Sequence, residues 1–281
     1  MKKMPVIFTF DLDAELIWRS RDPESVNMPV TMSLGEYGPK CGLPRILKVL
    51  EENDIHATFF VPGMVAEKYT EAVADIIRAG HEVGNHSYTH TYPYRLPDKA
   101  AEKEELTKTE AILEKMMGRK PCGYRSPAWE FSEYTIEILK EMGFKYSSNM
   151  MGSDRIEYLK VRGEQTNIVE FPISWGLDDA AYWLYSARTQ GKCMQPLSAV
   201  EDYWIREFDT LYEEFLEETE AGIDSDICYV MTCHPQIIGR PARITVLKKL
   251  IAHMKQFDQI AFINMNEAAD AFLAKSGTER R

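Results

Sequence analysis

The chain has 281 residues, 44% of them hydrophobic, and a formal net charge of −11. This composition is typical of a globular protein and excludes collagen-like, coiled-coil and intrinsically disordered chains. The acidic balance argues against a nucleic-acid partner, because phosphate binding needs clustered Lys and Arg. No apolar run reaches the ~18 residues that a membrane span needs, so we expect no membrane partner either.

The cysteines and the N-terminus predict the compartment. The five cysteines form no CxxC pair, and their odd number suits free thiols in a reducing compartment. The apolar run after the two N-terminal lysines ends at Asp11 and is too short for the core of a signal peptide. We therefore expect a cytoplasmic protein.

The first predicted strand spans residues 6–10, a β-branched and aromatic run bounded by charge. Residues 16–42 contain several Pro and Gly, which predicts a long loop, and long ordered loops are usually functional. Helix and strand patterns then alternate: a helix opened by Pro44, a strand at 57–61, a helix over 65–77 and a short strand at 82–83.

The alternation continues through the second half of the chain. Its predicted helices span about 106–117, 136–142 with Ser132 as the cap, 200–218, 244–254 and 267–273. Its predicted strands span about 145–147, 168–171, 228–232 and 260–263. Such alternation implies a parallel sheet, and about seven units favour a (β/α) barrel over a doubly wound open sheet. Without a repeat or linker, residues 1–281 are predicted to form a single domain.

Asp11 and Asp13 follow the first predicted strand. If the strand continues through them, side chains two residues apart project to the same face, so both carboxylates would share one pocket. Two carboxylates that close rarely both stay ionised without a cation. The pair therefore indicates a cation site, and the alternative is a pair of surface turn aspartates.

His86 and His90 follow another predicted strand, four residues apart. On a helical segment both imidazoles would lie on one face, which suits coordination of a divalent transition metal. Two incidental loop histidines are the alternative. With a carboxylate from a different strand end, the set becomes an open metal site with room for water and a substrate oxygen.

His234 follows the strand predicted at 228–232. A histidine there can act as general acid toward a leaving amine if a carboxylate orients it, and Asp178 and Asp179 are candidate partners. Arg125 could pair with another carboxylate. Taken singly, each of these residues is more often structural or a surface charge.

Five short motifs together resemble those of a known family. In chain order they are Thr-Phe-Asp-Leu-Asp, His-Ser-Tyr-Thr-His, Arg-Ser-Pro, Leu-Asp-Asp and Thr-Cys-His-Pro, within about residues 5–273. The ordered set resembles the polysaccharide deacetylase family, which has a NodB homology domain and is carbohydrate esterase 4-like. A His-Pro-x-x-x-Gly-Arg-Pro ending at Pro241 resembles most a subgroup of cytoplasmic peptidoglycan deacetylases, cyclic imide hydrolases and allantoinase-like enzymes.

The resemblance implies a distorted (β/α) barrel that binds a divalent metal ion. The implied ligands are Asp13, His86 and His90, and the implied ion is Zn²⁺. The resemblance also implies a homo-oligomer.

The resemblance further implies the catalytic roles. Asp11 would be the general base and Arg125 its charge partner. His234 would be the general acid, oriented by Asp178 or Asp179, and the sequence leaves that choice open.

Two positions depart from the pattern of the family. Leu12 separates aspartates that are adjacent in many members, which agrees with the strand geometry above. Ala128 displaces the expected aromatic residue to Trp129, so we take the backbone N–H of Ala128 as the oxyanion donor.

The predicted function is metal-dependent hydrolysis of a non-peptide carbon–nitrogen bond. The substrate is either a small cyclic imide or ureide, which suits a pocket closed by residues 16–42, or an N-acetylated amino sugar. The expected cytoplasmic location favours a small substrate. The alternative from another class is a catalytically inactive metal- or carbohydrate-binding module, against which Asp11 and His234 argue, because binding needs neither acid nor base.

The remaining features have structural interpretations. His56, His81 and His253 are predicted to be structural, because the first two precede strands and the third lies on a late helix. The aromatic residues at 182–185 are predicted to pack in the interior, with a sugar platform as the alternative. The acidic run at 213–220 is predicted to be a solvated helix face.

Overall fold

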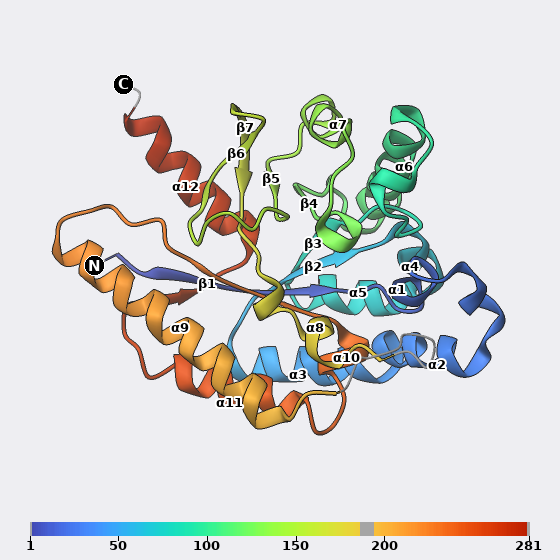
Figure 1. Cartoon of the computed structure of the whole chain (residues 1–281), viewed down its shortest axis with the longest axis horizontal. Helices are drawn as coiled ribbons and strands as arrows, with labels where there is room; N and C mark the ends of the chain where they lie inside the picture. The colour runs from blue at the N-terminus through green and yellow to red at the C-terminus, as the bar shows by residue number, and fades with distance from the viewer. Residues whose placement is uncertain (1, 186–193, 280–281) are drawn as a thin grey trace.

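The computed structural model describes residues 2–185 and 194–279. Within these residues a nine-stranded sheet has the order β6-β7-β5-β4-β3-β2-β1-β8, and β9 pairs with β1 (Figure 1). The strands are β1 Met4–Asp11, β2 Thr58–Val61, β3 Glu82–Asn85, β4 Gly123–Tyr124, β5 Tyr146–Ser147, β6 Glu157–Val161, β7 Glu164–Glu170, β8 Tyr229–Cys233 and β9 Ile260–Phe262.

The sheet is curled into a distorted (β/α) barrel, as predicted. Its strand pairs are parallel except β6 with β7, which form an antiparallel hairpin. Isolated bridges join Asp178 to Thr232 and Arg155 to Ile227, so segments beside the β6–β7 end of the sheet meet strand β8. The doubly wound open sheet is therefore wrong, because the two ends of this sheet approach each other.

Helices surround the sheet (Figure 1). The longer ones are α2 Pro29–Tyr37, α3 Leu43–Asn53, α5 Thr70–Arg78, α6 Lys99–Met117, α7 Thr135–Met142, α9 Leu197–Glu220, α11 Ile244–Met254 and α12 Met265–Glu279. The shorter ones are α1 Leu16–Arg19, α4 Gly63–Lys68, α8 Asp179–Trp183, α10 Pro235–Ile238 and the turns η1 Pro23–Asn27, η2 Gly38–Gly42, η3 Pro93–Arg95, η4 Pro127–Trp129 and η5 Trp175–Leu177.

The long loop predicted for residues 16–42 is wrong. The segment folds into α1, η1, α2 and η2. Pro23 and Pro29 are in the first turn of η1 and α2, where the fixed φ of proline suits a helix and its missing N–H costs nothing. In this segment the prolines mark the first turns of helices and do not indicate a loop.

Three smaller predictions also differ from the structure. The helix predicted over 65–77 is divided at Tyr69, where φ is −118° and ψ is 48°. The helix assigned to a Ser132 cap begins at Thr135, although the Ser132 hydroxyl does accept a hydrogen bond from the N–H of Tyr134. The strand predicted at 168–171 is the end of a longer hairpin, whose first strand β6 lacked a recognised pattern.

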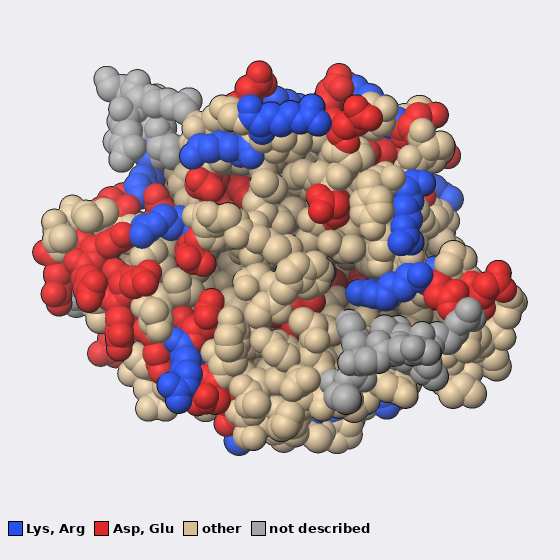
Figure 2. All heavy atoms as spheres, in the orientation of Figure 1, with Lys and Arg blue, Asp and Glu red and all other residues tan. Residues whose placement is uncertain are grey.

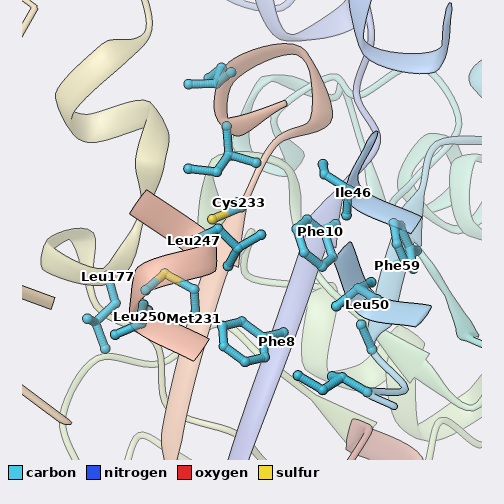
Figure 3. Close-up of a cluster of buried hydrophobic side chains, with 14 of the residues drawn as sticks. Phe8, Phe10, Ile46, Leu50, Phe59, Leu177, Met231, Cys233, Leu247 and Leu250 are labelled. Carbon is cyan, nitrogen blue, oxygen red and sulfur yellow. The ribbon is translucent and has the colours of Figure 1, made fainter. Parts of the chain in front are cut away.

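The hydrophobic core lies between strands β1 and β2 and helices α3 and α11 (Figure 3). Phe8 and Phe10 point from β1 into this core, while the alternate residues Thr9 and Asp11 face the interior of the barrel. Each fully buried aromatic or aliphatic side chain contributes roughly 1.5–3 kcal/mol of hydrophobic free energy. The core therefore anchors strand β1, which ends at Asp11 and is followed two residues later by Asp13.

Outside the site, predictions were made for the aromatic residues at 182–185, the acidic run at 213–220 and the cysteines. Of the aromatic residues predicted to pack in the interior, Trp183 is buried, Tyr182 is half-buried and Tyr185 is exposed, so the prediction is wrong for Tyr185. Glu213 and Glu214 are exposed on α9, where acidic atoms gather at the left edge of Figure 2. The four described cysteines are free thiols, and Cys193 lies outside the described residues. Among the described helices, none is long and apolar enough to cross a membrane.

Candidate active site

The predicted site residues lie at the carboxyl ends of the strands. Asp11 ends β1, His86 directly follows β3, Arg125 follows β4 and His234 follows β8. Asp178 is held beside β8 by its bridge to Thr232. Because these strands are parallel, their carboxyl ends meet on one side of the barrel, which is where chemistry gathers in (β/α) folds.

Asp13, His86 and His90 form a buried triad whose ligand atoms all lie within 4.8 Å of one another. His86 Nε2 is 3.2 Å from Asp13 Oδ1, and His90 Nε2 is 3.4 Å from Asp13 Oδ2. Residues 86–90 are not helical, so the two rings do not meet in the way that a helix would allow. Positive φ angles at Ser87 and His90 turn the chain instead and bring the two rings to 4.9 Å.

Contacts on the far side of each ring direct the triad toward one point. His86 Nδ1 donates to the carbonyl of Arg125 at 2.7 Å, which leaves Nε2 as the unprotonated nitrogen. His90 Nδ1 is 3.0 Å from the Ser20 hydroxyl. Asp13 Oδ1 is buried and has no hydrogen-bond partner among the described residues. A buried carboxylate with one orphaned oxygen, whose two oxygens each lie near an imidazole nitrogen, is the donor set of a divalent metal ion.

The electrostatics of Asp13 and His90 favour the protonation states that bind a metal. At His86, burial acts to lower the pKa of the imidazole, but Asp11 and Asp13 raise it above its ordinary value, so a metal ion would have to displace a proton there. Burial alone would raise the pKa of the Asp13 carboxyl, but His90 and His86 lower it far more and hold it well below its usual range. Burial lowers the pKa of His90 to about 3, so this ring is neutral near pH 7. A metal needs an ionised carboxylate and neutral imidazoles as ligands.

Asp11 is fixed by a buried arginine. Arg125 Nη1 donates to Asp11 Oδ1 and to the Thr9 hydroxyl, both at 2.8 Å, and Nη2 donates to the Ser148 hydroxyl at 2.9 Å. The guanidinium also packs on the ring of Phe60. The second oxygen of Asp11 lies 3.8 Å from His86 Nε2 and therefore faces the triad.

His234 is paired with Asp179. His234 Nδ1 lies 2.7 Å from Asp179 Oδ1 and 3.4 Å from Asp178 Oδ1. Burial would lower the pKa of the imidazole, but Asp179 and Asp178 raise it to about 10, which keeps the ring protonated. His234 Nε2 lies 3.5 Å from Asp13 Oδ2, so the imidazolium borders the triad.

One small cavity of about 20 Å³ is lined by eight of the residues named from the sequence: Asp11, Asp13, His86, His90, Ala128, Trp129, Asp178 and His234. Sequence reasoning missed four of its walls: Ile17 and Arg21, which lie in the segment expected to be a loop, and Trp175 and Ala180. Trp175 is 46% exposed and packs on Trp129 with ring centroids 4.3 Å apart. Its position three residues before the predicted Asp178 was the signal that could have drawn attention to it.

The backbone around Ala128 is turned toward the cavity. Ala128 lines it in a left-handed conformation, with φ 57° and ψ 16°. The N–H of the next residue, Trp129, donates to the carbonyl of Ser126 and is already engaged. This geometry favours the N–H of Ala128 over that of Trp129 as a donor to a bound ligand.

The comparisons with known proteins agree with this geometry. A family model described as polysaccharide deacetylase matches residues 30–147, which include His86, His90 and Arg125. A peptidoglycan deacetylase of Helicobacter pylori is 30% identical over an alignment that covers 98% of both chains. The chain belongs to the polysaccharide deacetylase family.

Solved structures of similar proteins support the same conclusion. A putative polysaccharide deacetylase from Mycobacterium smegmatis has a TM-score of 0.87 and 33% identity, covering 98% of this chain and 92% of that one. Puue allantoinase shares the fold, with a TM-score of 0.81 at 23% identity, covering 96% and 90%. As a polysaccharide deacetylase family member, the chain is a hydrolase of carbon–nitrogen bonds.

Proposed function

We propose that the chain is a metal-dependent hydrolase of non-peptide amides that acts on a small, soluble substrate. The observation that carries this proposal is the convergence of three arrangements on one cavity. These are the triad of Asp13 with two histidines, the Asp11–Arg125 pair and the His234–Asp179 pair.

Asp13, His86 and His90 would hold the ion, and two nitrogens with one carboxylate suit Zn²⁺ with an open fourth position. When bound, the ion would polarise the substrate carbonyl and lower the pKa of water to roughly 7. The orphaned oxygen of Asp13 is the feature that calls for a cation here.

The other residues would move protons and stabilise charge. Asp11, positioned by its hydrogen bond from Arg125, accepts a proton from the attacking water. His234, oriented by Asp179, donates its Nε2 proton to the departing nitrogen. The N–H of Ala128 faces the negative charge that develops on the carbonyl oxygen.

An inactive binding module is the less favourable interpretation. Burying the ionised Asp11 and Arg125 and the His234–Asp179 pair is costly, because charges lose their hydration. Binding a metal or a sugar requires neither pair. Retention of a base and an acid beside the triad supports catalysis.

The size of the cavity supports a small substrate. The space enclosed by its described lining is only about 20 Å³, which favours a substrate that presents one small group to the catalytic residues, such as a cyclic imide, a ureide or the acetamide of a single N-acetylated amino sugar. The H. pylori relative is named for peptidoglycan, so soluble precursors that carry an N-acetyl group belong among the candidates. The cytoplasmic location and the homo-oligomer remain predictions.

The test is hydrolysis by purified protein of known metal content. The substrates are chitooligosaccharides, N-acetylglucosamine, succinimide-type rings and allantoin. Asp11→Asn and His234→Ala are expected to keep bound zinc, measured by elemental analysis, and to lose about 10²-fold or more of kcat. Removal of the metal with a chelator should abolish turnover, and added Zn²⁺ should restore it.

The matched control is His56→Ala, because His56 is exposed and precedes β2 at the opposite end of the barrel. It should retain the activity of the wild type. Wild-type turnover by Asp11→Asn or His234→Ala with metal bound would contradict the assigned roles. Turnover of long chitooligosaccharides alone would contradict the small substrate.

A further inference from the structure

Arg21 is the sole Lys or Arg among the described residues that line the catalytic cavity. It lies beyond α1, in the segment between β1 and α2. Its Nη1 donates to the carbonyl of Ile17 at 2.8 Å, which fixes the guanidinium beside another cavity residue. The side chain is otherwise exposed, so its remaining N–H groups are open to solvent and to a ligand.

No carboxylate forms an ion pair with Arg21 within the part of the chain that the structure describes. This is notable because the protein carries 44 acidic residues against 33 Lys and Arg. Because Arg21 lines the same cavity as Asp11, Asp13 and the two histidines, its guanidinium is close to the site, and no described carboxylate neutralises it there.

We propose that Arg21 binds a carboxylate of the substrate, so that the enzyme prefers amides that carry a negative charge beside the reacting group. A guanidinium presents paired N–H donors in a planar fork that matches the two oxygens of a carboxylate. This inference rests on the proposed amide hydrolysis and narrows its substrate class.

The charges around the cavity favour a monoanion over a dianion. Asp11, Asp13 and Asp178 line the same cavity, and one uncompensated guanidinium can balance a single negative charge. A phosphate dianion would face these carboxylates with Arg21 as its one unpaired cation among the described lining residues, because His234 is paired with Asp179 and the divalent ion would be paired with Asp13. The single negative charge can be a carboxylate on an N-acetylated sugar or one on a cyclic ureide. The test separates these two kinds of substrate.

The test uses substrate pairs that differ in the carboxylate. One pair is N-acetylmuramic acid and N-acetylglucosamine, and the other is hydantoin-5-acetic acid and 5-methylhydantoin. The metal-loaded wild type should show the higher kcat/KM for the carboxylated member of the pair that it hydrolyses. Arg21→Gln should lower that value roughly 10- to 100-fold, mainly through KM, and affect the neutral member much less. Arg21→Lys should retain part of the preference.

Arg19→Gln is the matched control, because Arg19 lies two residues away but lines a different cavity with Glu15. It should preserve the preference. Equal kcat/KM for both members in the wild type, or equal losses for both in Arg21→Gln, would overturn the inference.

Titration calorimetry tests the role of Arg21 in binding even if the proposed hydrolysis is not observed. If no member of either pair is hydrolysed, the proposed hydrolysis fails for these substrates, and binding to the metal-loaded protein decides the role of Arg21. Tighter binding of N-acetylmuramic acid than of N-acetylglucosamine, weakened in Arg21→Gln, would support the inference. Equal binding in the two proteins, or none, would overturn it.

Discussion

Asp179 uses both of its oxygens at His234 and its neighbours, and this distinguishes it from the adjacent Asp178. Oδ1 accepts from His234 Nδ1 at 2.7 Å, and Oδ2 accepts from the backbone N–H groups of His234 and Ile238 at 3.0 and 2.9 Å. Asp178 instead accepts from the N–H of Ala180 at 2.9 Å and begins helix α8. The geometry therefore favours Asp179 as the orienting residue.

Asp179→Asn should lower kcat by about 10²-fold or more, because an amide has one acceptor oxygen for these contacts. If the amide oxygen accepts from the backbone N–H groups, the NH₂ group lies against the N–H donor of His234 Nδ1. If the oxygen accepts from the ring, the NH₂ group lies against the backbone N–H donors of His234 and Ile238. The measurement is kcat on the substrate found for the wild type, with circular dichroism as the check on folding.

Asp178→Asn is the matched comparison and should cost less in kcat, since its oxygen lies 3.4 Å from the ring and the amide can still cap α8. A larger loss in Asp178→Asn than in Asp179→Asn would reverse the assignment.

At the scale of elements, two backbone segments touch where η2 crosses α10. A Cβ added to Gly42 would overlap the carbonyl oxygen of Pro235, the residue that follows His234. A Cβ on Gly239 would in turn overlap the backbone of Gly42. The segment once interpreted as a loop is therefore part of the support that fixes the position of His234.

Gly42→Ala should destabilise the protein by roughly 1–3 kcal/mol, because the methyl group meets backbone atoms that cannot rotate away. It should also lower kcat, since α10 must shift and His234 is at its N-terminus. Urea unfolding and kcat are the measurements.

Gly152→Ala is the control, because no atom lies within 4 Å of the added methyl group and the backbone needs no positive φ there. It should match the wild type in both measurements. Wild-type stability in Gly42→Ala would contradict the close backbone contact.

For the molecule as a whole, one buried carboxyl away from the triad affects stability. Glu170 ends β7 with 2% of its surface exposed, and its Oε1 accepts from the N–H groups of Asn149 and Met150. Its Oε2 has no partner within the described residues. Burial raises its pKa from the ordinary value of 4.5 to about 7.

Glu170 should make the protein less stable as the pH rises from 4.5 to about 7. In this window the folded protein holds a proton that the unfolded chain has lost, so the free energy of unfolding falls with increasing pH. Glu170→Gln mimics the protonated form and lacks this loss. Its stability relative to the wild type should increase by on the order of 3 kcal/mol between pH 4.5 and 7, measured by urea unfolding across the range.

Other titrating groups are shared by the two proteins, so they cancel in this difference. Glu164→Gln, at the exposed opposite end of β7, should follow the wild-type profile. A difference between Glu170→Gln and the wild type that does not change with pH would contradict the raised pKa.

Much of the fold could be predicted because hydrophobic patterns are local. The buried run of β1 and the apolar faces of α3 and α11 are visible in the sequence, and their alternation implied a parallel sheet. The strands β4 and β6 could not be predicted, since one has two residues and the other has little apolar pattern. β4 is held by its parallel neighbours β3 and β5, which are separated from it by helices, and β6 is held by its hairpin with β7.

The ordered motifs of the sequence determined the family and the residue types of the site, because chemistry requires particular functional groups. Only the tertiary structure decided how they are arranged. The curl of the sheet brings Asp179 to His234, left-handed residues replace the expected helix at His90, and helical folding of residues 16–42 brings Arg21 to the cavity. The physical reason is that these distances depend on packing between segments far apart in sequence, which no local pattern encodes.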